Sequence, residues 1–156
     1  NLPLSPAVPE PERPSGGAVS VGIVLVSHSR ALAEAAMDLA RRLIVAVDVP
    51  VELAAGLADG GLGTDPGAVV EAVERLAERC EGVLVLADLG SGVMSAEMAL
   101  EMLDPALAER TRLSAAPFVE GLLGAYGAAG IGKDLQAVAA EADGAAEAKR
   151  SQVAAF

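Results

Sequence analysis

The feature that most constrains the fold is a continuous apolar run, Val21 to Val26, followed at once by an amphipathic segment. A strand that is apolar on both faces is typical of a parallel sheet with helices packed on both sides. The same alternation recurs along the chain, with further strands expected at 51–55, 83–87 and 112–116. Four such units joined by short links predict an α/β fold: a doubly wound, four-stranded, mainly parallel sheet with right-handed crossovers and helices on both faces.

Helices are expected after each of these strands. The first runs from Ser29 or Ala31 to Leu43, and the others cover 66–79, 94–103, 118–129 and 134–150. Asp65 before Pro66 is a good helix start, because Pro lacks only an N–H that has no intrahelical partner there. Apolar spacing predicts that the first two helices pack inward through Leu32, Ala35, Ala36, Leu39 and Leu43, and through Val69, Val70, Val73 and Leu76.

The chain of 156 residues is long enough for one domain with an ordinary core. Residues 1–17 contain Pro3, Pro6, Pro9, Pro11 and Pro14 and end in Ser-Gly-Gly, a composition that does not offset the entropy lost on ordering. We therefore expect a flexible leader at 1–17, one globular domain at 18–151 and a short tail at 152–156.

The balance of 11 Lys and Arg against 22 Asp and Glu gives a net charge of −11. This charge disfavours nucleic acid and anionic membranes and favours protein partners with basic docking faces. No apolar stretch approaches the roughly 18 residues that a membrane span needs, and the amino terminus lacks the pattern of a secretory signal. The lone Cys80 lies in a helical pattern and is expected to be a buried thiol without an internal disulfide. These features predict a cytoplasmic protein.

The only histidine, His28, lies where the first strand gives way to a helix, between Ser27 and Ser29. In an open α/β sheet the carboxyl ends of the strands hold the chemistry, so His28 is a candidate covalent carrier. Asp88 follows the third strand directly and can orient the imidazole by accepting one ring N–H, which leaves the other nitrogen nucleophilic. An aspartate that merely caps the next helix is an equally good interpretation of Asp88.

A phosphoryl group on His28 would be favoured by the N–H groups and the positive end of the helix that follows Ser29. Candidate phosphoryl-binding residues at the same edge of the sheet are Ser27, Ser29, Thr64, Gly90 and Ser91. Taken singly, each hydroxyl is also explained as a turn or cap residue.

Other chemistries find little support in this sequence. One His and one Cys make no zinc or iron site, so neither a metal ion nor a cofactor is expected. The Gly-rich segment 60–64 lacks the spacing of dinucleotide-binding and phosphate loops. A receiver domain would need an acidic pair after the first strand, where this chain has Ser27, His28 and Ser29, and no Gly-x-Ser-x-Gly nucleophile elbow follows a strand.

Five segments in order along the chain resemble one known family. They are Val-Leu-Val-Ser-His-Ser at 24–29, Ala-Ala-Gly at 54–56 with Gly-Thr at 63–64, Asp-Leu-Gly-Ser at 88–91 with Ser-Ala-Glu at 95–97, Ala-Pro-Phe-Val-Glu-Gly at 116–121 and Glu-Ala-Lys-Arg at 147–150. Over residues 20–151 the chain is similar to the DhaM family, the phosphocarrier subunits of bacterial phosphoenolpyruvate (PEP)-dependent dihydroxyacetone kinases. The occurrence of all five segments in register makes the resemblance specific.

The resemblance implies a mannose-family IIA fold of the phosphotransferase system (PTS), usually a homodimer. In that family a histidine, here His28, accepts phosphoryl from HPr and passes it to ADP on DhaL, which serves dihydroxyacetone bound to DhaK. The family's aspartate beside the histidine falls on Asp88. Some members carry HPr-like and enzyme-I-like domains after this module. This chain stops at Phe156 and is therefore expected to be a stand-alone IIA module. Its Pro-rich leader departs from the family pattern.

Three rival functions stay open at this point. A mannose-type IIA domain of a sugar transporter would use the same phosphohistidine but pass phosphoryl to a IIB domain. Val-Ser-His-Ser at 26–29 is similar to the His-containing start of small metal chelatases, although those enzymes generally need further metal-directed side chains. A catalytically silent binding or regulatory module is the third.

Overall fold

Four parallel strands form one sheet in the computed structural model, which describes residues 19–156. The strands are β1 (Val19–Ser27), β2 (Val51–Ala55), β3 (Cys80–Ala87) and β4 (Thr111–Leu113), arranged in the order β2-β1-β3-β4. Every neighbouring pair is parallel. The predicted α/β sheet is therefore confirmed, whereas the leader expected at 1–17 lies outside the described residues.

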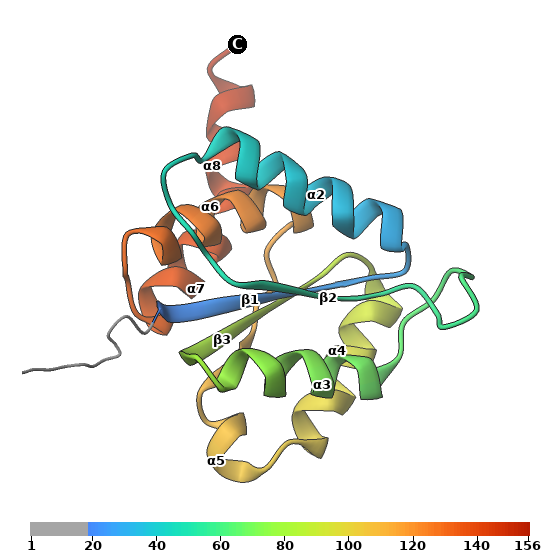
Figure 1. Ribbon diagram of the computed structural model, residues 1–156. Coiled ribbons are helices and arrows are strands. Elements are labelled where there is room, and N and C mark those ends of the chain that lie inside the picture. Colours follow the sequence, from blue (N-terminus) through green and yellow to red (C-terminus); the bar gives the residue numbers. More distant parts are fainter. Residues whose placement is uncertain (1–18) are drawn as a thin grey trace, which may run out of the picture.

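Seven helices of this part of the chain cover the sheet. They are α2 (Arg30–Leu43), α3 (Pro66–Ala77), α4 (Gly90–Met102), α5 (Pro105–Ala108), α6 (Phe118–Gly130), α7 (Leu135–Asp143) and α8 (Ala145–Ala154). Figure 1 shows α2, α6 and α7 on one side of the sheet and α3 and α4 on the other. This arrangement leaves the carboxyl ends of the strands at one open edge.

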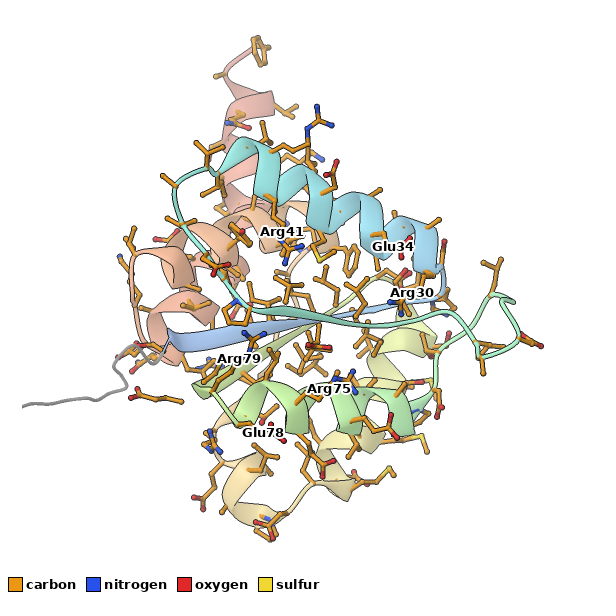
Figure 2. All side chains as sticks on the ribbon, viewed as in Figure 1. Arg30, Glu34, Arg41, Arg75, Glu78 and Arg79 are labelled. Atoms are coloured by element: carbon orange, nitrogen blue, oxygen red, sulfur yellow. The ribbon has the colours of Figure 1, made fainter. Side chains whose placement is uncertain are left out.

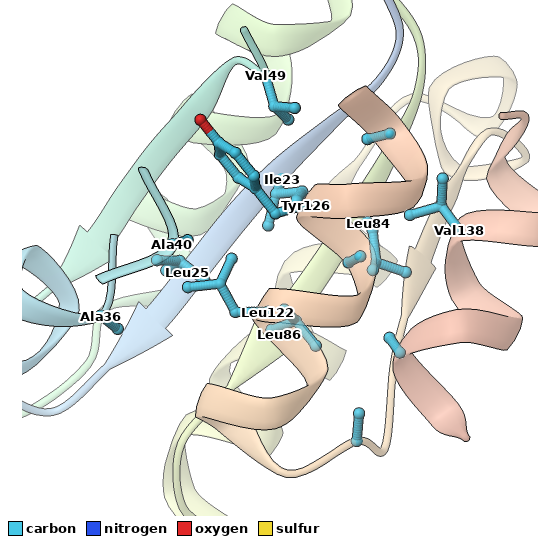
Figure 3. Close-up of a cluster of buried hydrophobic side chains, with 14 of the residues drawn as sticks. Ile23, Leu25, Ala36, Ala40, Val49, Leu84, Leu86, Leu122, Tyr126 and Val138 are labelled. Atoms are coloured by element: carbon cyan, nitrogen blue, oxygen red, sulfur yellow. The ribbon is translucent and has the colours of Figure 1, made fainter. Parts of the chain in front are cut away.

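The core has two halves because alternate side chains of each strand point to opposite faces of the sheet. Ile23 and Leu25 of β1 pack toward α2, α6 and α7, and Figure 3 shows them near Leu122 and Tyr126 of α6. Their neighbour Val24 packs on the other face, toward α3 and α4. Each fully buried side chain of this size contributes about 1.5–3 kcal/mol, so both faces of β1 anchor the sheet.

The inner face predicted for α2 is correct at Ala36 and wrong at the other four residues. Ala33, Ala36 and Ala40 are the buried residues of this helix, whereas Leu32, Leu39 and Leu43 are 43%, 39% and 62% exposed. Ala35 is also exposed. Small side chains let the helix approach β1 closely, and the row of larger leucines is thereby turned outward. On α3 the prediction holds better: Val69, Val73 and Leu76 are buried, and Val70 is partly buried.

Several predicted boundaries also change. Cys80 is the first residue of β3 and not part of a helix, because it pairs with Val19 across the sheet. The thiol is buried as expected, and burial raises its pKa. The helix α4 begins at Gly90, four residues before the predicted Met94, and the short α5 was not predicted.

The predicted helix 134–150 is in fact two helices. Gly144 separates α7 from α8, and α8 continues to Ala154. Val138, Ala139 and Ala142 of α7 are buried, whereas α8 contains no buried residue. The apolar periodicity ends with α7, which is why one continuous helix was the wrong interpretation.

The close contact between α6 and α7 gives a stability prediction. A Cβ at Gly124 would lie 2.9 Å from the backbone oxygen of Glu141, whereas one at Gly127 would meet only Ile44 Cδ1 at 3.9 Å. We expect Gly124→Ala to reduce the free energy of unfolding by about 1–3 kcal/mol through overpacking. The matched control Gly127→Ala should increase it by up to about 1 kcal/mol through helix propensity. Urea unfolding of both variants tests this, and equal effects would contradict the packing described.

Candidate active site

The sheet brings His28 and Asp88 together. Strands β1 and β3 are neighbours, and their register pairs Val26 with Ala87 just before the two strands end. The next residues of each strand, Ser27 with His28 on one side and Asp88 on the other, therefore meet at the carboxyl edge. This is the edge predicted to hold the chemistry.

The carboxylate of Asp88 is the centre of the site. Oδ1 lies 2.9 Å from His28 Nδ1 and accepts from the Leu89 N–H at 2.7 Å. Oδ2 accepts from the Ser27 hydroxyl at 2.9 Å and from the His28 N–H at 3.0 Å. The Asp88 side chain is 6% exposed, so these four contacts replace water around it. Asp88 does not cap α4, since the N-cap position is Leu89 and no side chain bonds there.

The charge of Asp88 fixes the role of the ring nitrogen beside it. Burial alone would raise the pKa of Asp88, but the hydrogen bonds from His28, Ser27 and Leu89 outweigh burial and lower the pKa below its ordinary value. An ionised carboxylate only accepts hydrogen bonds. Nδ1 of His28 must therefore carry a proton, and in the neutral ring Nε2 holds the free lone pair.

The other side of the imidazole faces Ser91 and the start of α4. Nε2 of His28 and Oγ of Ser91 are hydrogen-bonded. The His28 side chain is 24% exposed and Ser91 is exposed, so a visiting group can reach this nitrogen. Because the first N–H groups of a helix have no intrahelical acceptor, and no side chain caps α4, its amino end favours an anion beside Nε2.

The remaining predicted residues surround this centre at different distances. Ser27 is buried, donates to Asp88 and accepts from the Ser29 N–H at 3.1 Å. Ser29 caps α2 by accepting from the Leu32 N–H at 3.1 Å. The Thr64 hydroxyl is bonded to Ser95 Oγ at 2.6 Å and not to His28. Gly90 lies in the first turn of α4, and a Cβ there would meet nothing within 4 Å. Ser91 alone of the five lies at Nε2.

Gly92 and Ser95 complete the site and were not predicted as site residues. A Cβ at Gly92 would lie 3.0 Å from Asp88 Oδ1 and 3.7 Å from His28 Cε1, so a larger residue there would press on the Asp88 carboxylate. Ser95 follows Ser91 by four residues and therefore lies on the same helix face. This spacing in the sequence could have identified Ser95 as a site residue. Its bond to Thr64 ties α4 to the loop whose Gly63 N–H donates to the His28 carbonyl at 2.8 Å.

Two further findings concern ligands and membranes. Over residues 19–156, no group of three or more His, Cys, Asp or Glu side chains is placed to hold a metal ion. Within the same range, no helix combines the length and the apolar character that crossing a membrane requires.

The fold and the site define a class of protein. The family model EIIA-man, described as "PTS system fructose IIA component", matches residues 22–139. The chain therefore belongs to the EIIA-man family, and the fold expected from the resemblance is confirmed.

The similarity to DhaM is also confirmed. The DhaM proteins of Klebsiella michiganensis and Escherichia coli, each described as the phosphoryl donor subunit of PEP-dependent dihydroxyacetone kinase, are 44% identical over 135 residues. Each match covers 85% of this chain and 28% of the relative, so the chain spans less than a third of their length. The DhaM subunit of dihydroxyacetone kinase 2 from Listeria innocua is 36% identical over 101 residues, which cover 65% of this chain and 79% of that protein.

Solved structures share the architecture. The crystal structure of a protein of unknown function has a TM-score of 0.74 at 32% identity, covering 81% of this chain and 95% of that one. A sigma-54 interaction domain protein from Enterococcus faecalis has a TM-score of 0.60 at 17% identity, covering 86% and 95% of the two chains. The second likeness concerns the fold alone.

The lowered pKa of Asp88 gives a prediction for stability against pH. Asp88→Asn keeps the size of the side chain but removes its charge, and should reduce the free energy of unfolding at pH 7 by about 1.5–3 kcal/mol, as for a hydrogen bond to a charged group. A carboxylate whose pKa is lower in the folded protein stabilises it above the ordinary carboxyl pKa, and this contribution is lost as pH falls through the folded-state value. Urea unfolding curves of the two proteins should therefore converge toward acid pH. A difference in unfolding free energy between wild type and Asp88→Asn that stays constant with pH would contradict this account.

Proposed function

We propose that this chain is a phosphohistidine carrier, a phosphotransferase subunit of a PEP-dependent dihydroxyacetone kinase. His28 accepts phosphoryl from HPr and transfers it to ADP bound on DhaL, which then phosphorylates dihydroxyacetone held by DhaK. One observation carries the proposal: Nδ1 of the only histidine is held by a buried carboxylate while Nε2 faces the open edge of the sheet. The names of the 44% identical relatives support the choice of kinase system.

The transfer chemistry follows from the state of the ring. The Nε2 lone pair attacks phosphorus in line, and the bond from phosphorus to the histidine nitrogen of HPr breaks as its electron pair returns to HPr. Nδ1 keeps its proton, and Asp88 stabilises the positive charge that develops on the ring. In the second step a β-phosphate oxygen of ADP attacks the same phosphorus, and the pair of electrons returns to Nε2. Positioning supplies most of the assistance in both steps.

The phosphoryl oxygens would be bound on the α4 side of the ring. We assign this role to the Ser91 hydroxyl and to the free N–H groups at the start of α4, including that of Gly90. Ser27, Ser29 and Thr64 support it less directly, since their hydroxyls are engaged with Asp88, the start of α2 and Ser95. A modest stabilisation suits a carrier, because a tightly held phosphoryl group would stop the relay.

We also propose that the carrier works in the cytoplasm as a homodimer. The outer side of α2 supports self-association, because Leu32, Leu39 and Leu43 are exposed beside charges of both signs. Two ion pairs lie on this helix. Arg30 Nε is 3.5 Å from Glu34 Oε2, and both residues are labelled in Figure 2. Arg42 Nη1 is 3.6 Å from Asp38 Oδ2.

Incubation with PEP, enzyme I and HPr tests the carrier role. The wild-type protein should acquire phosphate that is labile in acid and stable in base, and His28→Ala should acquire none. The phosphorylated protein should then convert ADP on DhaL to ATP. Transfer to a IIB protein with no transfer to DhaL would instead identify a mannose-type sugar transporter domain, and absence of any phosphate on wild type would refute a carrier function.

Asp88→Ala and Asp134→Ala form a matched pair within the same experiment. Asp88→Ala should fold but accept phosphoryl about 10- to 100-fold more slowly, the rate equivalent of a hydrogen bond to a charged group. Asp134 caps α7 by accepting from the Ala137 N–H at 3.0 Å, so Asp134→Ala removes a carboxylate without affecting the ring. Equal rates for the two variants would reduce Asp88 to a purely structural role.

A further inference from the structure

A row of exposed apolar side chains runs along α4 from the edge of the site. Leu89, Met94, Met98 and Met102, called the methionine stripe below, are 64%, 62%, 54% and 58% exposed. The three methionines are spaced by four residues, so they lie in one line along the helix. Large apolar side chains gathered in one exposed patch mark an interaction site.

The stripe is continuous with the candidate active site. Leu89 donates its N–H to Asp88, and Met94 lies one helical turn beyond Ser91, the residue bonded to His28 Nε2. On the other side of the histidine, Leu62 is 76% exposed and adjoins Gly63, which donates to the His28 carbonyl. Exposed apolar side chains therefore flank the accessible nitrogen, and a protein seated on α4 would lie over it.

The charged side chains of α4 itself are all negative. Glu97 and Glu101 are exposed and alternate with the methionines along α4. No Lys or Arg occurs between Arg79 and Arg110 in the sequence. The surface thus presents an apolar line with an acidic border, which fits an apolar patch bordered by Lys or Arg and speeds the encounter with such a protein.

These charges argue against a second copy of the chain as the occupant. In a two-fold contact the same surface meets itself, so the carboxylates of Glu97 and Glu101 would face equal charges with no cation on α4 to offset them. Methionine side chains are flexible and adapt to partners of different shape. That property suits a brief contact with a protein that must leave after each transfer.

We propose that the methionine stripe is the docking surface for the protein that donates phosphoryl to His28, and that this donor presents an apolar patch bordered by basic residues. The proposal rests on the carrier function proposed above. It assigns recognition to α4 residues that take no part in the chemistry, since Met98 lies two helical turns from Ser91.

Met98→Glu and Ile131→Glu test the proposal as a matched pair. Ile131 lies at the end of α6 and is 70% exposed. The adjoining Gly130 packs on Val47, which precedes β2, so Ile131 lies at the amino ends of the strands, opposite His28. Both substitutions add the same charge to an exposed position. With HPr as donor, Met98→Glu should raise KM at least about tenfold, the effect of losing roughly 1.4 kcal/mol of contact energy. Ile131→Glu should leave KM within twofold of wild type.

Phosphoramidate separates docking from chemistry, because this small donor transfers its phosphoryl group and releases ammonia without a docking surface. Both variants should be phosphorylated by it at the wild-type rate. An unchanged KM for HPr in Met98→Glu would overturn the docking proposal while leaving the carrier function intact. A loss of reactivity of Met98→Glu toward phosphoramidate would also overturn the docking proposal. So would the finding that the wild-type protein is a dimer and that Met98→Glu dissociates this dimer. Failure of wild type with both donors would refute the carrier function itself.

Discussion

The contact between the Asp88 carboxylate and His28 depends on the sheet and in turn organises everything at its carboxyl edge. Parallel pairing of β1 with β3 places the two residues side by side. The carboxylate then accepts from the His28 backbone N–H as well as from the ring, so one group fixes both the chain and the imidazole. Because the charge is buried and fully hydrogen-bonded, Nδ1 is held as a donor and Nε2 is left for chemistry. Gly92 suits this arrangement, since a Cβ there would lie 3.0 Å from Asp88 Oδ1.

The sequence predicted those parts of the fold in which the apolar pattern is strong. The buried strands were found because β1 and β3 are apolar on both faces, and parallel order then placed His28 near Asp88. The start of α4 was missed because Gly90, Ser91 and Gly92 resemble a loop by composition. In the folded protein this segment brings Ser91 to the His28 ring and Gly92 against Asp88, contacts that no local pattern reports. The face of α2 was misjudged because leucine is more apolar than alanine, whereas close packing on β1 selected Ala33, Ala36 and Ala40.

The surface divides into regions of different character around this centre. The leucines that α2 turns outward lie among paired charges of both signs, a composition that tolerates a second copy of the chain. The methionine stripe lies on α4, whose only charged side chains are carboxylates, and it begins beside the reactive nitrogen. A carrier needs both a stable body and a face that exchanges partners, and the two carboxylates of α4, Glu97 and Glu101, border the face where the exchange is proposed.

The most direct test of the account is nitrogen-15 NMR of the His28 imidazole, before and after phosphorylation. In the free protein the neutral ring should carry its proton on Nδ1, with Nε2 showing the shift of an unprotonated nitrogen. After phosphorylation, coupling to phosphorus-31 should appear at Nε2 while Nδ1 remains protonated. A proton on Nε2 in the free ring, or phosphorus attached to Nδ1, would contradict the central role given to the Asp88 carboxylate.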